Sequence, residues 1–342
     1  METQDGIILL DPHPRPLDLI FSPEDKARLE RLGRVVWHEG SPAPEEHVEK
    51  YLPETVAIIG QTPMPRERLE RAPRLRMIAN VESNFLPNVD YEECHRRNVH
   101  VVATGPVFAQ PVAEMALGMA LSSARRTHEA DASVRRGDES LYGEADNYDS
   151  FLLRGKTLGL LGCGNLGRAL LPLLRPFSRD IIAHDPWIHP SVLREMNVEP
   201  VGFDELFERS RVLFVLAATT TENQGAIGAR QFSSMKDGSV FVLVSRAGVV
   251  DFEAMLDAAE SGRIRVAVDV FPEEPIPAGH RARTTPNTLL SAHRAGNIPE
   301  IWHGMGSMVV DDLELVLRGL PPQRCQRAAP ETVARLRSKP VS

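Results

Sequence analysis

The sequence is poor in cysteine, in clusters of basic residues and in long apolar runs. Its three cysteines, Cys94, Cys163 and Cys325, are odd in number and lack the spacing of metal ligands, which favours a reduced compartment and a protein without a metal site. The 39 lysines and arginines stand against 47 aspartates and glutamates, a formal net charge of −8, and lie singly or in pairs beside acids. Nucleic acid and an anionic membrane surface are therefore disfavoured as main partners.

The apolar runs are too short for a membrane span. The longest, residues 112–124, contains Glu114 and falls short of the ~20 residues that a spanning helix needs. No basic segment followed by an apolar one opens the sequence, as a secretory signal would. We expect a soluble, cytoplasmic protein. With 342 residues, 42% of them hydrophobic, the sequence has room for two domains of ~100 to 200 residues and a cleft between them.

A glycine fingerprint stands near the middle of the sequence. Residues 157–161 form an apolar run typical of a buried parallel strand, and Gly162, Gly164 and Gly167 follow it at the spacing GxGxxG. The first glycine permits a tight turn, the second lets backbone approach a pyrophosphate, and the third lets the following helix pack on the strand. Glycines also occur in ordinary turns, but here Asp185 ends the next apolar run. This context predicts a dinucleotide site.

Short apolar runs alternate with helical patterns in two series, which implies two parallel sheets. The first series predicts strands at 6–11, 35–37, 56–59, 77–79 and 100–102, with helices at 23–32 and 90–97 among them. The second predicts strands at 158–162, 180–185, 212–217, 240–245, 265–271 and 288–293, with helices at 166–175, 190–196, 230–235 and 251–260. Because the fingerprint follows its first strand, the second series predicts a doubly wound dinucleotide-binding fold with its ligand at the carboxyl ends of the strands.

Two longer helices and two polar segments complete the pattern. The helices are expected near 111–125 and 299–318, the first with small and apolar residues on most faces, which indicates burial between domains or subunits. Residues 126–150 are polar, and this composition is typical either of an exposed excursion of the chain at the surface or of an arm that contacts a second subunit in a dimer. The segment 322–342 is rich in proline, arginine and alanine, and the sequence leaves open whether it is held in place.

Three polar residues lie just beyond expected strand ends, where this fold places ligands: Arg246, Glu274 and His293. Taken singly, the arginine is more typical of a surface cation, the glutamate of a solvated acid, and the histidine of a hydrogen-bonded residue in the core or at its rim. Together they supply a proton carrier near neutral pH, a carboxylate that orients it, and a forked cation that binds a carboxylate or polarises a carbonyl. Beside a nicotinamide, these groups favour hydride transfer at a carbon that bears a hydroxyl or keto group.

At these motifs the sequence resembles the D-isomer-specific 2-hydroxyacid dehydrogenase family, which includes phosphoglycerate, glycerate, glyoxylate and D-lactate dehydrogenases. The resemblance covers most of the chain. Its ordered motifs are MIANVESNFLPNVDYEEC (77–94), TGPVFAQPVAEMALGMAL (104–121), GKTLGLLGCGNLG (155–167), IAHDP (182–186), VSRAGVVD (244–251), VDVFPEEP (268–275) and SAHRAG (291–296).

The resemblance implies roles for these residues. The family's catalytic arginine, glutamate and histidine fall on Arg246, Glu274 and His293. Asp269 matches the aspartate at the nicotinamide amide, and Asp185 matches the acid on the adenosine ribose, whose charge favours NAD(H) over NADP(H). The residues expected at the cofactor are Gly162, Gly164, Asn165, Leu166, Gly167, Asp185, Val244, Ser245, Arg246, Asp269, His293 and Gly296. Those expected at the substrate are Val81, Glu82, Ser83, Asn84, Arg246 and His293.

The resemblance also implies an α/β architecture in which one domain is inserted into the other. A Rossmann-type doubly wound parallel sheet, residues 106–297, is inserted into a smaller flavodoxin-like α/β substrate domain formed by residues 1–105 and 298–342. The two long helices become the crossings between the domains. A homodimer is expected from the family and from the charged segment after the first long helix.

The sequence departs from the family pattern at several positions. Where most members have a glycine-rich loop whose backbone binds the substrate carboxylate, this sequence has NVESNFLPN (80–88), and Glu82 is an awkward neighbour for an anion. We expect its side chain to point away. Ala247 and Ala292 replace a usual glycine and proline without removing a functional group. Cys163, within the phosphate loop, is expected to be a buried, inert thiol rather than a redox switch.

The combined prediction is an NAD(H)-dependent enzyme that interconverts a 2-keto acid and a D-2-hydroxy acid. One alternative is an NAD(H)-sensing binding protein of the same fold, because the family includes corepressors that keep these residues. A second is a relative that acts on another small anion such as formate or phosphite. Formate is disfavoured because the family's formate enzymes carry glutamine where this sequence has Glu274. The identity of the acid is beyond the sequence.

Overall fold

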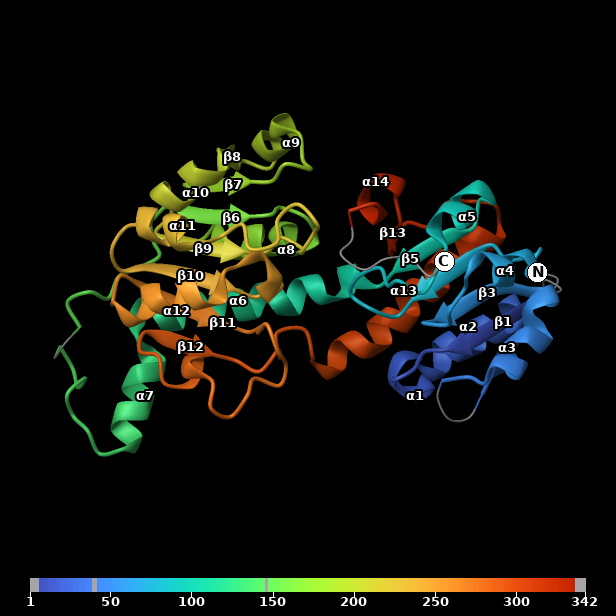
Figure 1. Ribbon diagram of the computed structural model, residues 1–342, viewed down its shortest axis with the longest axis horizontal. Helices are drawn as coiled ribbons and strands as arrows, with labels where there is room; N and C mark the ends of the chain where they lie inside the picture. The colour runs from blue at the N-terminus through green and yellow to red at the C-terminus, as the bar shows by residue number, and fades with distance from the viewer. Residues whose placement is uncertain (1–5, 39–41, 145–146, 336–342) are drawn as a thin grey trace. The chain divides into compact units, whose positions relative to one another are not determined.

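The computed structural model describes residues 6–38, 42–144 and 147–335, and the chain divides into two compact units (Figure 1). Unit 1 is formed by residues 1–108 and 298–342, and unit 2 by residues 109–297. The chain passes from one unit to the other at two points, and a long helix begins at or next to each: α6 (Ala109–Arg125) in unit 2 and α13 (Pro299–Leu317) in unit 1.

Unit 1 is built on a six-stranded sheet with the order β13-β5-β4-β3-β1-β2. Its strands are β1 (Ile7–Asp11), β2 (Arg34–Trp37), β3 (Thr55–Gly60), β4 (Met77–Asn80), β5 (His100–Ala103) and β13 (Gln326–Arg327). The first five are parallel in the flavodoxin-like order 2-1-3-4-5, and β13 adds an antiparallel edge strand beside β5. β1, β3 and β4 are buried along their whole length, which is why they read as continuous apolar runs.

Helices cover both faces of this sheet. One face packs against α1 (Leu17–Ile20), α2 (Pro23–Leu32) and α13. The other packs against α3 (Glu45–Tyr51), α4 (Arg66–Glu70) and α5 (Tyr91–Arg96), and α14 (Pro330–Val333) adjoins α5. The short 3-10 turns η1 (Leu52–Glu54) and η2 (Gly105–Phe108) precede β3 and α6. Helix starts follow local chemistry: Ser22 caps α2 and Asp90 caps α5, each accepting a backbone N–H three residues on.

Unit 2 is built on a seven-stranded parallel sheet with the order β12-β11-β10-β9-β6-β7-β8. Its strands are β6 (Leu158–Leu161), β7 (Ile181–His184), β8 (Glu199–Pro200), β9 (Val212–Val215), β10 (Ser239–Leu243), β11 (Ile264–Val268) and β12 (Thr288–Leu290). Counted from β6, this is the doubly wound order 3-2-1-4-5-6 with one strand added. The strand order reverses between β6 and β9, where such a sheet binds its ligand. The expected α/β class with a Rossmann-type sheet is thus confirmed.

The helices of unit 2 also form two layers (Figure 1). α6 and α8 (Asn165–Leu174) pack on each other over one face. α10 (Phe203–Arg209), α11 (Ala229–Ser234) and α12 (Phe252–Glu260) cover the other. The remaining helical pieces are α7 (Thr127–Arg135), α9 (Pro190–Glu195), η3 (Ala247–Val249) and η4 (Arg281–Arg283). Asp251 caps α12 by accepting the N–H of Ala254, as its position before the apolar pattern predicts.

Several elements differ from the sequence-based expectation. Within the segment 126–150, the structure has the helix α7, and α10 and β8 lie in a stretch where no element was expected. The segment after residue 322 is held over its described part, because β13 and α14 lie there. The buried carboxylate of Asp312 on α13 accepts the N–H groups of Gln323, Arg324 and Cys325 at 2.6, 2.8 and 2.7 Å. Residues 336–342 of this segment lie outside the described part.

Gly306 sets how closely α13 can approach α1. A Cβ at this position would overlap the carbonyl oxygen of Ile20, whereas a Cβ at Gly304, on the same helix, would meet only the tip of the Val107 side chain, at 2.9 Å. We therefore expect Gly306→Ala to lower the free energy of unfolding of unit 1 by about 1–3 kcal/mol, as overpacking does. Urea denaturation followed by circular dichroism measures this.

Gly304→Ala is the matched control, because it brings the same gain in helix propensity without the backbone clash. Its free energy of unfolding should stay within about 1 kcal/mol of the parent value. If the two substitutions change the free energy of unfolding equally, the close approach of α13 to α1 is not what makes Gly306 necessary.

Candidate active site

The predicted site residues of unit 2 lie at the carboxyl ends of neighbouring parallel strands. Arg246 follows β10, Glu274 follows β11 and His293 follows β12, and these three strands are adjacent in the sheet. The glycine loop follows β6, and Asp185 follows β7. Residues that are far apart in the sequence therefore share one edge of the sheet, because parallel strands present all their carboxyl ends on the same side.

His293 and Glu274 form a hydrogen-bonded pair. Their atoms Nδ1 and Oε2 are 2.5 Å apart, and the other carboxylate oxygen of Glu274 accepts the backbone N–H of Phe271 at 2.8 Å. The side chains are 42% and 34% exposed, so that a small molecule can reach the imidazole while the carboxylate holds it. With Nδ1 engaged by Glu274, the second ring nitrogen, Nε2, is the one that can exchange a proton with a bound molecule.

The buried Asp269 shapes the turn that carries His293. Its two carboxylate oxygens accept the N–H groups of Arg294 and Ala295, at 2.9 and 3.1 Å, and its carbonyl oxygen accepts the N–H of His293 at 2.8 Å. His293 itself has a φ of 51°, in the left-handed region that side chains other than glycine rarely adopt. Asp269 thus stabilises a conformation that costs of order 1–3 kcal/mol on its own.

Arg246 is exposed at the end of β10, directly before η3. Its guanidinium donates to the carbonyl oxygen of Ser245 at 2.7 Å. Ser245 is buried, and its hydroxyl has no hydrogen-bond partner within the described residues. Val244, just before it, is buried, and Gly296 lies three residues after His293. The segment that follows β10 therefore presents the hydroxyl of Ser245 and the guanidinium of Arg246 where the cofactor is predicted to bind.

The glycine loop fits a dinucleotide pyrophosphate. Gly162 has a φ of 92°, and a Cβ there would lie 2.9 Å from the backbone nitrogen of Ala217. A Cβ at Gly167 would lie 2.9 Å from the carbonyl oxygen of Gly162, which explains the close approach of α8 to the loop. Gly164, the N-cap of α8, is exposed with open space around it. Together with Asn165 and Leu166, the loop aims the first turn of a helix at this space, which is the usual seat of a phosphate.

Asp185 faces the same loop from the end of β7. One carboxylate oxygen accepts the N–H of Cys163 at 2.7 Å, and the other accepts the N–H of Trp187 at 2.9 Å. Asp185 is only half-buried, so its carboxylate keeps lone pairs for a further donor such as a ribose hydroxyl. These two hydrogen bonds hold the carboxylate in place at the end of β7.

The cysteines have the character of buried, inert thiols. Burial raises the pKa of the Cys163 thiol to about 11, and the nearby Asp185 carboxylate adds to this. Burial likewise raises the pKa of Cys94 to about 12 and raises that of Cys325. All three are unpaired by disulfides. Because the thiolate is the reactive form, none of them has the properties of a redox or catalytic cysteine at neutral pH.

The loop after β9 was missed by the sequence analysis. Ala217 lies against Gly162, and Thr219 has a buried hydroxyl with no hydrogen-bond partner among the described residues. β9 is the strand next to β6 at the point where the strand order reverses. The strand-end argument that found Arg246 and His293 also applies to this strand, and it would have added residues 216–220 to the candidate cofactor site.

In unit 1, the predicted substrate loop follows β4. The backbone N–H groups of Glu82 and Asn84 donate to no other described residue, and the side chain of Asn84 accepts the N–H of Phe85 at 2.9 Å. The Glu82 carboxylate is engaged by Arg15, which donates from both terminal nitrogens, and by the Gln61 amide. The structure thus assigns a definite partner to the acid that departs from the family pattern.

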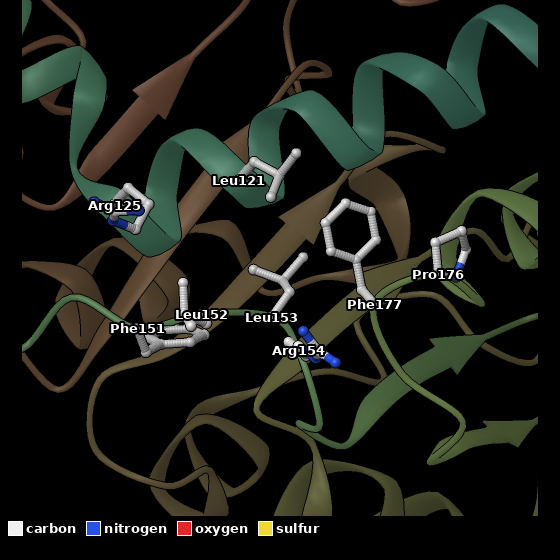
Figure 2. Close-up of a pocket in the computed structure, with 8 residues that line it drawn as sticks. All are labelled: Leu121, Arg125, Phe151, Leu152, Leu153, Arg154, Pro176 and Phe177. Atoms are coloured by element: carbon white, nitrogen blue, oxygen red, sulfur yellow. The ribbon is translucent and has the colours of Figure 1, made fainter.

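Unit 2 also contains an apolar pocket of about 340 Å³. Its lining residues, shown in Figure 2, are Leu121, Arg125, Phe151, Leu152, Leu153, Arg154, Pro176 and Phe177. They come from the last turns of α6 and from the segments that lead into β6 and β7. These are the amino ends of the strands, so this pocket lies at the sheet edge opposite to the candidate active site.

Among the described residues, no group of three or more histidine, cysteine, aspartate or glutamate side chains could hold a metal ion. No helix in the same ranges is both long and apolar enough to cross a membrane.

Comparison with known proteins identifies the family of the chain. Residues 117–295 match the family model described as D-isomer specific 2-hydroxyacid dehydrogenase, NAD binding domain. A glyoxylate reductase of Thermococcus litoralis is 32% identical over 262 residues, which are 75% of this chain and 78% of that protein. The solved structure of a phosphoglycerate oxidoreductase from Rhizobium etli is 43% identical, with a TM-score of 0.86, and the match covers 96% of this chain and 100% of that one.

The first curated relatives are longer proteins. A D-3-phosphoglycerate dehydrogenase of Methanocaldococcus jannaschii is 30% identical over 294 residues, which are 85% of this chain but 55% of that protein. The chain thus spans about half the length of such relatives. The family model covers more than half of this chain, and the match to the Thermococcus litoralis protein extends over most of both sequences. The chain therefore belongs to the D-isomer-specific 2-hydroxyacid dehydrogenase family.

Proposed function

We propose that the protein is an NAD(H)-dependent oxidoreductase that interconverts a 2-keto acid and a D-2-hydroxy acid. The observation that carries this proposal is the pair of His293 and Glu274, 2.5 Å apart, at the sheet edge that also carries the glycine loop. A histidine held by a carboxylate is suited to move a proton at neutral pH. In this proposal, unit 2 binds the dinucleotide and unit 1 binds the substrate.

The residues of the site divide the chemistry between them. The nicotinamide, when bound, supplies or accepts the hydride at the substrate carbon. In reduction, protonated His293 donates its proton from Nε2 to the carbonyl oxygen, and in oxidation the neutral ring accepts the hydroxyl proton. Glu274 fixes the orientation of the ring and stabilises its positive charge. Arg246 binds the substrate carboxylate and polarises the carbonyl.

The loop of Val81, Glu82, Ser83 and Asn84 supplies the second contact to the substrate. Two of its N–H groups, on Glu82 and Asn84, are available as donors, and backbone donors of this kind bind a carboxylate well. In this proposal, these backbone N–H groups hold the carboxylate of the substrate.

The proposal is tested by mixing NADH with a panel of 2-keto acids that includes glyoxylate, hydroxypyruvate, pyruvate and bulkier members, and following absorbance at the nicotinamide band. At least one acid should be reduced. His293→Ala should lower turnover of that acid by ~100-fold or more, because it removes the proton donor. NADH affinity, measured by fluorescence titration, should stay nearly unchanged.

Glu274→Gln keeps the size of the side chain and removes its charge. Turnover should fall less than in His293→Ala, because the imidazole is still present and loses only the carboxylate that orients it. Tight NADH binding without turnover of any acid by the parent protein would favour an NAD(H) sensor instead. Full activity of His293→Ala would contradict the assigned role of the histidine.

Asp185 carries the proposed preference for NAD(H) over NADP(H). Its carboxylate is fixed at the end of β7 by two backbone N–H groups, where it would accept from the adenosine ribose and repel a phosphate on that ribose. Asp185→Asn should reduce the preference for NADH over NADPH, measured as the ratio of their Kd values, by about 10-fold or more, equal to at least ~1.4 kcal/mol.

Asp180→Asn is the matched control for this change. Asp180 precedes the same strand, at the opposite sheet edge, and accepts from the Thr157 hydroxyl at 2.6 Å. Its replacement should leave the ratio of Kd values unchanged. A parent protein that binds NADPH as tightly as NADH would refute the role given to Asp185.

We also propose that two copies of the chain associate through unit 2. Large apolar side chains are exposed between residues 134 and 152: Tyr142 is 74% exposed, Tyr148 94% and Leu152 63%. Leu152 is also part of the apolar pocket of Figure 2. Such a concentration of apolar surface on one segment is typical of an interaction site, and a second copy of the chain supplies the matching surface in a symmetric dimer.

Analytical ultracentrifugation at assay concentration should show a dimer. Leu152→Asp should shift the protein toward the monomer, because a charge there would be buried in the interface. Leu320→Asp is the control, since Leu320 is an exposed leucine of unit 1, at 42% exposure. A monomeric parent protein would overturn this part of the proposal.

A further inference from the structure

Arg15 and Glu82 form an ion pair within unit 1 that the assigned roles do not explain. Arg15 lies in the turn after β1, where its N–H donates to the carbonyl oxygen of Pro12 at 3.1 Å. One guanidinium nitrogen donates both to the carbonyl oxygen of Val81, at 2.9 Å, and to the Glu82 carboxylate. The other donates to the second oxygen of that carboxylate at 3.3 Å. The contact is therefore forked, and it reaches the loop through both side chain and backbone.

The surroundings hold this pair in one geometry. The side chains are only 19% and 27% exposed. The guanidinium lies over the ring of Trp302, with its carbon 5.5 Å from the ring centre, and Gln61 donates to the Glu82 carboxylate at 3.3 Å. The carbonyl of Glu82 is fixed as well, because it accepts from the N–H and the hydroxyl of Thr104 at 3.0 and 3.1 Å. Loop and ion pair are thus one ordered assembly.

The charge of Glu82 conflicts with the role proposed for its own backbone. The N–H groups of Glu82 and Asn84 are suited to bind an anion, but an uncompensated carboxylate on the same loop would repel it. Repulsion between two like charges in a half-buried site is strong enough to lower anion affinity by orders of magnitude. Arg15 brings the net charge of the pair to zero, so the N–H groups can act.

Building on the proposed function, we propose that Arg15 is a charge-compensating positioning residue that makes the 81–84 loop competent to bind the carboxylate of a 2-keto acid. It acts through Glu82 and through the Val81 carbonyl, and it takes no part in hydride or proton transfer. The proposal differs from a purely structural role in one respect. If Arg15 acts by compensating charge, its loss is harmful only while Glu82 is ionised.

A double-mutant cycle tests this difference. Arg15→Met should raise the KM for the best 2-keto acid by about 10- to 100-fold, with kcat within about 3-fold of the parent value. Glu82→Gln added to it should restore most of the loss in KM, because no negative charge then remains to be compensated. The rise in KM caused by Arg15→Met should become smaller as the salt concentration is raised from about 0.05 to about 0.5 M, because dissolved ions screen a partly exposed charge over this range. Arg15→Lys should keep part of the function.

Two further measurements keep the outcomes separate. Thermal unfolding shows whether each variant is folded, and NADH affinity should be unchanged in all of them because the nucleotide residues belong to unit 2. Equal impairment of Arg15→Met and of the double variant would overturn the proposal in favour of a structural clamp. If the parent protein reduces none of the acids, the proposed function fails, and calorimetric titration with oxalate in the presence of NADH still decides the role of Arg15. No oxalate binding by the parent protein, or equal binding by parent and Arg15→Met, would overturn it.

Discussion

The hydrogen bonds of the buried Asp269 carboxylate are the interaction on which the candidate site depends. They fix the backbone of residues 294–295 and, with the Asp269 carbonyl, the N–H of His293. The left-handed conformation of His293 follows from this, and so does the direction in which its ring meets Glu274. A carboxylate that accepts two backbone donors is satisfied although it is buried, which is why Asp269 can follow β11 without an ion pair to any described residue. The pairing of His293 with Glu274 therefore depends on the segments that follow both β11 and β12.

The sequence was sufficient for the parts of the structure that depend on local patterns. Strands β6, β10 and β11 are wholly buried and read as apolar runs, and the glycine spacing after β6 marked the turn. Parallel strands carry their carboxyl ends to one edge of the sheet, so Arg246, Glu274 and His293 can be grouped from the sequence alone. The roles proposed for these residues rest on this shared position and on the pairing of His293 with Glu274.

Other parts depend on contacts between distant residues, which no local pattern encodes. Arg15 and Glu82 are 67 positions apart, and only the adjacency of β1, β3 and β4 brings their loops together. The hydrogen bond that Asp269 accepts from the backbone of Arg294, 25 residues later, likewise has no local sequence pattern that predicts it. The helix α7 has few apolar residues, and β13 has two residues in all, so neither has a period long enough to be recognised. The loop after β9 was missed because its residues are small and carry no charge.

The discontinuity of unit 1 has a consequence for the order in which the chain can fold. One face of its sheet is covered by α13, whose Met305, Val309 and Leu313 are fully buried. Asp312 on the same helix anchors the segment that leads to β13, the last strand beside β5. Unit 2 is contiguous in the sequence and can fold as soon as residue 297 has emerged, whereas the sheet of unit 1 lacks α13 and β13 until residues 299–327 follow. The loop beside Glu82 gains part of its support only after α13 has been synthesised, because the Arg15 guanidinium lies over Trp302 of that helix.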